Sequence, residues 1–151
     1  PETMLFEVNY ISNSKVIAIG DNLISSINLL TGKRNDFSYE GKKLTAFDIS
    51  KKEGILLSLS SSEGGTDCDL IFLNKNGQVT GNPIKTQQKI FSVSYKFGKL
   101  AALSYGKVTI YNHSGETLKT FETKSDSKAI TLFSSNSLYS LGLTEINKIY
   151  F

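Results

Sequence analysis

Several residue types that often carry structure or chemistry are scarce in this sequence of 151 residues. It contains no tryptophan, and its single cysteine, Cys68, excludes an internal disulfide and any metal site built from several cysteines. The single histidine, His113, cannot form a Cys/His metal site by itself. No apolar run approaches the roughly 18 residues of a membrane-spanning helix, and no signal-peptide pattern opens the sequence. The composition is that of a globular protein without a metal or redox motif.

Charges of both signs are present but nowhere concentrated. Lys and Arg number 17 against 14 Asp and Glu, which gives a formal net charge of +3. The densest basic groups are only pairs: Lys33-Arg34, Lys42-Lys43 and Lys51-Lys52. A nucleic-acid-binding domain usually carries a concentrated basic stripe instead. We therefore expect solvated surface lysines and no nucleic-acid partner.

The acidic residues are also scattered, with no close carboxylate pair on one predicted strand face to divide acid and base roles. The sequence lacks a glycine-rich phosphate loop, a nucleophile elbow and a zinc motif. It therefore predicts no catalytic residue, no cofactor and no cofactor-binding residue.

One short pattern recurs four times: a large apolar residue, a polar residue and a second apolar residue. The copies begin at Phe6, Phe47, Phe91 and Ile130. Alternation of apolar and polar residues predicts a half-buried strand at the start of each unit. The interval of about 40 residues is that of a propeller blade.

An apolar run follows each copy and predicts a second strand that is buried on both faces. The runs cover residues 16–19, 55–59, 100–103 and 138–141. Gly54 and Gly98 precede the second and third runs, where tight turns with positive φ are expected.

A third strand in three of the units ends in a polar turn that contains Asn and Gly. These segments cover residues 27–33, 72–78 and 111–116. Such turns are typical of hairpins with positive φ at Gly. A fourth, more polar strand is predicted over 36–40, 78–85 and 117–123, and Pro83 within it fits an outer edge strand.

Four short strands in each unit, with no convincing helical period, predict an all-β fold of β-propeller blades. A four-stranded sheet buries little by itself, so such sheets gain a core by stacking radially. A sandwich or barrel is the alternative, but neither usually repeats one four-strand motif with one turn chemistry. We expect a single partial β-propeller of about four four-stranded antiparallel sheets, the last incomplete. The approximate blades are 1–41, 42–86, 87–125 and 126–151.

The three turns resemble those between the third and fourth strands of bacterial propellers with PQQ-like or WD40-like blades. They are Asn28-x-x-Thr31-Gly32-Lys33, Asn74-Lys75-Asn76-Gly77-Gln78 and Asn112-His113-Ser114-Gly115-Glu116. No Trp-Asp dipeptide is present, and nothing specific to PQQ can be carried over. The pattern also resembles an uncharacterised group of Gram-positive bacterial proteins in which a membrane-anchoring helix precedes a propeller. That resemblance implies an extracytoplasmic parent protein that meets the membrane only through its anchor, with a cytoplasmic location as the alternative.

The fourth unit ends with its third strand, over residues 146–151. Only three residues precede the first inner strand, too few to supply the missing outer strand. We therefore expect the sequence to be part of a larger propeller. The apolar faces of its first and last blades would then be exposed, and the piece would self-associate.

Cys68 and His113 are the residues to consider first for nucleophilic chemistry. His113 lies in a polar turn whose equivalents carry Leu30 and Lys75, so a turn residue is expected rather than a catalytic base. Cys68 would need a nearby histidine to become a nucleophile, and we expect a partly buried structural thiol. Tyr39, Tyr105 and Tyr139 are expected to be exposed, at rims and blade faces.

The most individual segment lies between Leu59 and Leu70. It is about six residues longer than the matching segment between Leu103 and Val108. In propellers this connection shares a face with the links between blades, and that face usually holds the binding site. The binding-loop candidates are Ser62, Glu63, Gly64, Gly65, Thr66 and Asp67.

The same segment contains acidic residues that could offer oxygens to a hard cation such as Ca²⁺. These metal candidates are Glu63, Asp67 and Asp69. They lack the regular spacing of a dedicated calcium loop, so a Gly/Ser loop with solvated acids is the alternative.

These observations favour a non-enzymatic scaffold, a propeller module that binds a protein or peptide on its loop face. The alternative is part of an enzyme or carbohydrate-binding propeller whose site residues lie mostly in blades outside this sequence. Fold alone does not decide between them.

Overall fold

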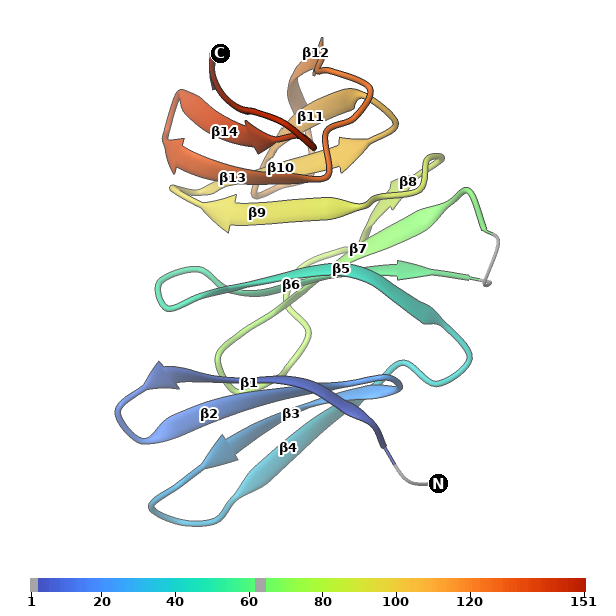
Figure 1. Cartoon of the computed structure of the whole chain (residues 1–151). Coiled ribbons are helices and arrows are strands. Elements are labelled where there is room, and N and C mark those ends of the chain that lie inside the picture. Colours follow the sequence, from blue (N-terminus) through green and yellow to red (C-terminus); the bar gives the residue numbers. More distant parts are fainter. Residues whose placement is uncertain (1–2, 62–64) are drawn as a thin grey trace.

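The computed structural model describes residues 3–61 and 65–151, which form fifteen strands in four antiparallel sheets (Figure 1). The first sheet contains β1 (Leu5–Ser12), β2 (Lys15–Gly20), β3 (Leu23–Asn28) and β4 (Arg34–Ser38). The second contains β5 (Lys43–Ser50), β6 (Gly54–Ser60), β7 (Cys68–Leu73) and β8 (Ile84–Thr86). The third contains β9 (Ser92–Lys96), β10 (Lys99–Ser104), β11 (Lys107–Asn112) and β12 (Thr117–Glu122). The fourth contains β13 (Ala129–Ser134), β14 (Ser137–Leu141) and β15 (Ile146–Tyr150).

Strands that follow one another in sequence lie side by side within every sheet. The sheets are stacked in chain order, from the N-terminal sheet at the bottom of Figure 1 to the C-terminal sheet at the top. The first strands of successive sheets contact one another, β1 with β5, β5 with β9 and β9 with β13. Within the described residues no strand of the fourth sheet contacts the first, so the array is open. None of these residues forms a helix that could span a membrane.

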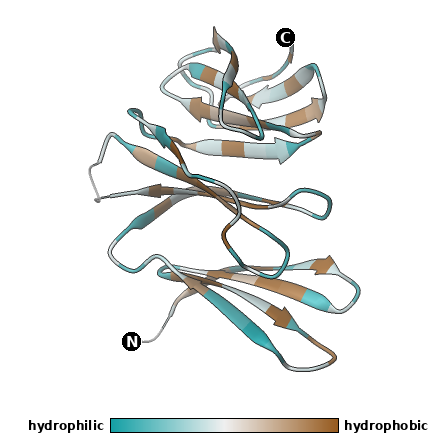
Figure 2. Ribbon diagram, turned by 180° about the vertical axis from the view of Figure 1, so that it is seen from behind, coloured by the Kyte–Doolittle hydropathy of each residue, from teal (hydrophilic) through white to brown (hydrophobic). Residues whose placement is uncertain are grey.

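Three hydrophobic cores fill the spaces between successive sheets. All seven residues of β6 are buried, because this strand contributes to two cores at once. Ile55 and Leu57 pack toward the first sheet, and Leu56 between them packs toward the third. Successive side chains of a strand point to opposite faces, so a continuous apolar run suits a strand with a sheet on either side. Figure 2 shows these apolar stretches along the strands and polar residues in many of the loops.

The recurring Asn-Gly turns fold through the same contact in each copy. The Asn side-chain oxygen accepts hydrogen bonds from backbone N–H groups two to four residues later, which closes the turn locally. The acceptors are Asn28, Asn74 and Asn112. The glycines of these turns have positive φ, as predicted, with values of 71°, 75° and 87° for Gly32, Gly77 and Gly115.

Gly54 is required for a second reason. Its φ is 110°, and a Cβ built on it would lie 2.5 Å from the backbone oxygen of Leu73. A side chain there would be strained and would also push β6 away from β7. Gly98, the other predicted turn glycine, has a φ of 67° and open space around it.

The innermost strands are also tied together by hydrogen bonds between sheets. Each such strand has one edge without a paired strand, and its N–H groups there need other acceptors. Polar side chains of the preceding sheet supply them. Asp48 accepts from Tyr95 N at 2.7 Å, Ser92 from Ile130 N at 3.1 Å and Ser94 from Leu132 N at 2.9 Å.

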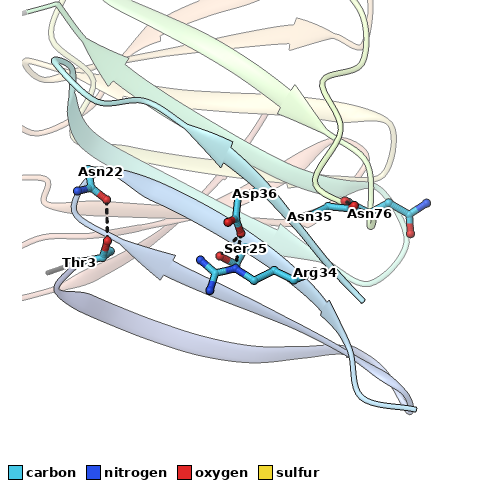
Figure 3. A network of polar contacts seen from close by, with 7 residues as sticks. All are labelled: Thr3, Asn22, Ser25, Arg34, Asn35, Asp36 and Asn76. Atoms are coloured by element: carbon cyan, nitrogen blue, oxygen red, sulfur yellow. Dashed lines mark hydrogen bonds and ion pairs between the residues drawn. The ribbon is translucent and has the colours of Figure 1, made fainter. Parts of the chain in front are cut away.

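Two local expectations differ from the structure. The fourth strand of the second sheet is only β8, because the turn at residues 74–77 packs on the first sheet. Val79 and Thr80 keep only an isolated bridge to Leu73 and one backbone hydrogen bond to Phe72 O. Ser26 Oγ donates to Lys75 O at 2.8 Å. Asn35 Nδ2 donates to Asn76 O at 3.1 Å, and Figure 3 shows these two residues side by side.

Tyr39 was expected to be exposed and is instead buried within the first core. Its hydroxyl donates a hydrogen bond to Gly20 O, and burial raises the pKa of Tyr39 to about 12. The side chain therefore pins the link after β4 to the turn after β2.

Candidate functional site

The segment between β6 and β7 was the leading candidate from the sequence. Of its six binding-loop residues, Ser62, Glu63 and Gly64 lie outside the described residues, whereas Gly65, Thr66 and Asp67 lie within them. Thr66 and Asp67 are exposed. Ser61 Oγ lies 3.2 Å from both carboxylate oxygens of Asp67, a contact that links the two ends of the segment.

The acidic candidates for a metal site have partners within the protein. Asp67 accepts from Ser61, and Asp69 on β7 forms a 3.1 Å ion pair with Lys42. Glu63 lies outside the described residues. Over 3–61 and 65–151, no three His, Cys, Asp or Glu side chains gather as a metal site would require.

Cys68 and His113 are far apart in the fold. Cys68 begins β7, whereas His113 follows the end of β11, the corresponding strand of the next sheet. Cys68 is buried in the second core, and its Sγ accepts a hydrogen bond from Ile90 N at 3.5 Å. The thiol thus contacts the link between the second and third sheets.

That link and the turn between β10 and β11 each carry one exposed aromatic side chain at the same end of the sheets as the β6–β7 segment. Phe91 lies just before β9, and Tyr105 lies in the turn between β10 and β11. Their rings make an edge-to-face contact with centroids 4.8 Å apart, and Lys89 Nζ lies 5.8 Å from the Phe91 ring. Phe91 is 39% exposed and Tyr105 is 72% exposed. We call Lys89, Phe91 and Tyr105 the aromatic platform.

Hydrogen bonds fix the backbone beneath the aromatic platform. Phe91 N donates to Leu103 O at 2.9 Å, and Ser104 Oγ donates to Gln88 Oε1 at 2.7 Å. Thr86 Oγ1 donates to Cys68 O at 3.0 Å and to Gln88 O at 2.9 Å. The link is therefore held between β7 and β10, which gives the exposed rings a firm base.

A groove of about 400 Å³ lies between the second and third sheets, and its lining includes Gln88, Ile90 and Ser104, which directly precede the three residues of the aromatic platform in the sequence. Its lining is mostly hydroxyl and amide groups, with Lys85 and Lys107 as the charged residues and no acid. The polar part of the lining comprises Lys85, Thr86, Gln87, Gln88, Ser104, Lys107, Thr109, Tyr111, Thr117 and Thr120. The short β8 leaves this space between the sheets.

A smaller polar hollow of about 200 Å³ lies between the first sheet and residues 74–83. Its polar groups are largely used within the protein. Lys15 Nζ donates to Asn76 Oδ1, and Ser26 Oγ donates to the Lys75 carbonyl. Asn28 Oδ1 accepts from the backbone N–H of Leu30 in its own turn. This hollow is best explained as the seam that fastens the 74–83 segment to the first sheet.

Sequence reasoning placed Phe91 inside the first strand of its unit and so missed the aromatic platform. The strand begins one residue later, at Ser92, which leaves Phe91 in the link. A usable signal was Tyr105 directly before Gly106, because a tight turn projects a large side chain away from the sheet.

The sequence matches no protein-family model and no curated protein. Solved structures do resemble it. The computationally designed Ika4 protein aligns over 100% of this chain and 93% of its own, at 15% identity and a TM-score of 0.71. The β-propeller domain of Cps50 (Swd1) from Myceliophteria thermophila aligns over 99% of this chain and 54% of its own, at 14% identity and a TM-score of 0.71.

BamB from Moraxella catarrhalis aligns over 95% of this chain and 42% of its own, at 17% identity and a TM-score of 0.63. The chain is an open array of four β-propeller blades. It spans about half the length of the two natural propellers named here. The all-β class and the incomplete, three-stranded last blade were both predicted correctly. At these identities the likeness shows the fold alone.

In propeller terms, the aromatic platform lies on the face that carries the links between blades. The β6–β7 segment of the second blade opens onto the same face, and the Cys68–Ile90 contact joins the base of that segment to the link. The groove then runs outward between the second and third blades. This arrangement offers exposed rings, cationic side chains and hydrogen-bonding groups, which suit recognition of another chain.

Proposed function

We propose that this protein is a non-enzymatic binding module that holds an extended acidic peptide segment of a partner protein. The segment would lie in the groove between the second and third blades and place an apolar side chain on the aromatic platform. The observation that carries the proposal is the exposed, firmly supported Phe91–Tyr105 pair beside this groove.

Aromatic residues are enriched at interfaces because they bury a large area at a low cost in conformational entropy. The aromatic platform is also pre-organised by the hydrogen bonds of the link, so little ordering is needed on binding. Such an anchor can supply the few contacts that dominate the affinity of a protein interface.

The charge of the site favours acidic partners. Lys85 and Lys107 line the groove, Lys89 Nζ lies over the Phe91 ring, and no acid is among the lining residues. Threonine and glutamine side chains along the groove can donate to and accept from the backbone of an extended peptide. Binding should therefore weaken as salt is added.

The test is to select peptides from a random displayed library on the wild-type protein and measure their affinities by calorimetry. We expect the selected peptides to be rich in Asp and Glu around an apolar residue. The double variant Phe91→Ala/Tyr105→Ala should lower their affinity at least about 30-fold, because truncating one hot-spot residue costs about 2 kcal/mol. Leu30→Ala is the matched control, since Leu30 is a highly exposed apolar residue in the β3–β4 turn.

Equal binding by the double variant and the wild type would contradict the proposal, as would selected peptides without acidic residues. Binding on a glycan array that depends on Phe91 and Tyr105 would favour the carbohydrate alternative. Deleting residues 61–66 tests the loop prediction separately. Retention of all peptide binding by the folded deletion variant would exclude that segment from the site.

A further inference from the structure

The first blade turns an apolar face away from the rest of the array. In β1, Val8 pairs with Ala18 and Tyr10 pairs with Val16. Paired residues share a face, and this one is opposite to the face through which Ile17 contacts the second blade. Tyr10 is 63% exposed, and Val8 is also exposed. We call this surface the leading face.

The fourth blade has a free apolar face at the other end of the array. Ala129, Leu141 and Ile146 form one row across its three strands. With Tyr139 they line a shallow apolar hollow of about 430 Å³. Ile146 and Tyr150 are 68% and 69% exposed. We call this surface the trailing face.

The repeat makes these two faces complementary. The third residue of the recurring pattern packs against the preceding blade, as Ile49 does in the second blade and Leu132 in the fourth. Val8 occupies this position in the first blade and has no preceding blade within the described chain. The leading face is thus of the kind that each later blade buries.

The trailing face corresponds in the same way to the surfaces that earlier blades bury against their successors. Leu103 pairs with Ser92 and is buried against the fourth blade. In the fourth blade the equivalent pair is Tyr139 with Thr131. Thr131 thus stands where Ser92 accepts an N–H from the next inner strand, and its Oγ1 accepts from Lys96 Nζ at 3.2 Å within the chain.

We propose that the trailing face of one copy binds the leading face of a second copy, so that two copies close head to tail into one ring. Two arrays of four blades make eight, which lies within the range of about four to eight blades usual for propellers. A head-to-tail contact between identical chains gives a ring if its rotation closes. The second copy would restore at each end the kind of interface that already joins the blades.

The area available is adequate for such a dimer. The main exposed apolar side chains are Val8 and Tyr10 on one face and Phe133, Leu141, Ile146 and Tyr150 on the other. At about 100 Å² each they would bury roughly 600 Å² per contact, and two contacts reach the lower end of stable interfaces. Lys148 lies over this surface with Nζ 4.5 Å from the Phe133 ring. The attraction between the cation and the ring face would offset part of the free energy that the ammonium group loses when the contact removes its water.

The aromatic platform belongs to the second and third blades, so ring closure would leave it accessible. This inference therefore does not depend on the proposed peptide binding. It is tested first by the mass of the 151-residue protein in solution, measured by light scattering at micromolar concentration. We expect twice the 16.6 kDa of one chain. A monomer, or a series of larger assemblies, would overturn the proposal.

Charge substitutions locate the contact. Val8→Glu and Leu141→Glu should each raise the dissociation constant at least about 100-fold, because each change appears at both contacts of the ring. Leu30→Glu places the same charge on an exposed apolar residue away from both faces and should leave the dimer intact. Circular dichroism would check that each variant is folded. A dimer that survives both face substitutions would refute the assignment.

Cross-linking distinguishes head-to-tail from face-to-face pairing. Val8→Cys and Leu141→Cys proteins, mixed and treated with a short bismaleimide, should form a covalent dimer. Either variant treated alone should not, because its new thiol would face an unmodified surface. Cys68 is buried and should not react. Wild-type protein treated with the same reagent is the control for any reaction at this residue. Cross-linking of a single variant with itself would contradict the ring.

Discussion

Replacing Ser94 with alanine removes one of the hydrogen bonds that join the third and fourth blades. Ser94 is fully buried, and its Oγ accepts the N–H of Leu132 at 2.9 Å across 38 residues of sequence. Alanine leaves that buried N–H without its acceptor, which costs about 1–3 kcal/mol. We therefore expect the free energy of unfolding to fall by about 2 kcal/mol.

The assay is urea unfolding followed by circular dichroism. With a slope of about 2 kcal/mol per molar, the midpoint should fall by about 1 M while the slope stays unchanged. Hydrogen exchange should also show faster exchange at the Leu132 amide. Ser92→Ala removes the longer, 3.1 Å hydrogen bond to Ile130 N at a half-buried position. It should lower the free energy of unfolding by less than Ser94→Ala does.

Ser135→Ala, at an exposed position in the β13–β14 turn, is the matched control and should change stability by less than about 0.5 kcal/mol. A Ser94→Ala protein as stable as this control would refute the reasoning. The side-chain acceptors would then not be part of what holds the inner strands together.

Two further predictions concern single side chains of the fold. Gly54→Ala should lower the melting temperature by roughly 5–10 °C, because positive φ and a clash with a β7 carbonyl together cost at least about 2 kcal/mol. Gly98→Ala, where the added Cβ meets open space, should lower the melting temperature by about half as much. Burial raises the pKa of Tyr39 to about 12, so its stabilising contribution is complete below pH 10 and falls as pH rises toward 12. The wild type should lose roughly 2–3 kcal/mol more than Tyr39→Phe over that interval in denaturant titrations, and parallel pH curves would contradict this assignment.

Local patterns were sufficient to predict most of the strands. The inner strand, the apolar second strand and the Asn-Gly turn each follow from alternation and from turn chemistry within a few residues. The hydrogen bonds of Asn28, Asn74 and Asn112 explain why those turns recur. These features need no knowledge of distant contacts.

Features that depend on contacts between residues far apart in the sequence were missed. A fourth strand was predicted over residues 78–85, but only Ile84 to Thr86 form one, and the turn before it bonds through Lys75 O and Asn76 O to the first blade. Tyr39 follows a polar strand, yet its hydroxyl finds Gly20 O inside the first core. Tertiary partners overrode local preference in both cases.

The candidate site was predicted only in part. The long segment between β6 and β7 indicated the face on which the proposed site lies, because a length difference between repeats is visible without a structure. The aromatic platform was not predicted, since Phe91 and Tyr105 come from different parts of one blade and meet only in the fold. The proposed peptide site therefore lies on the same face as the inserted segment rather than in it.

The binding account is tested most directly by the footprint of a selected acidic peptide on the backbone amide signals of the protein in solution. We predict that the shifted signals gather at residues 85–91 and 104–107, around the aromatic platform and along the groove. Signals of the β3–β4 turn should not move. Shifts confined to other surfaces, with those two segments unchanged, would contradict the account.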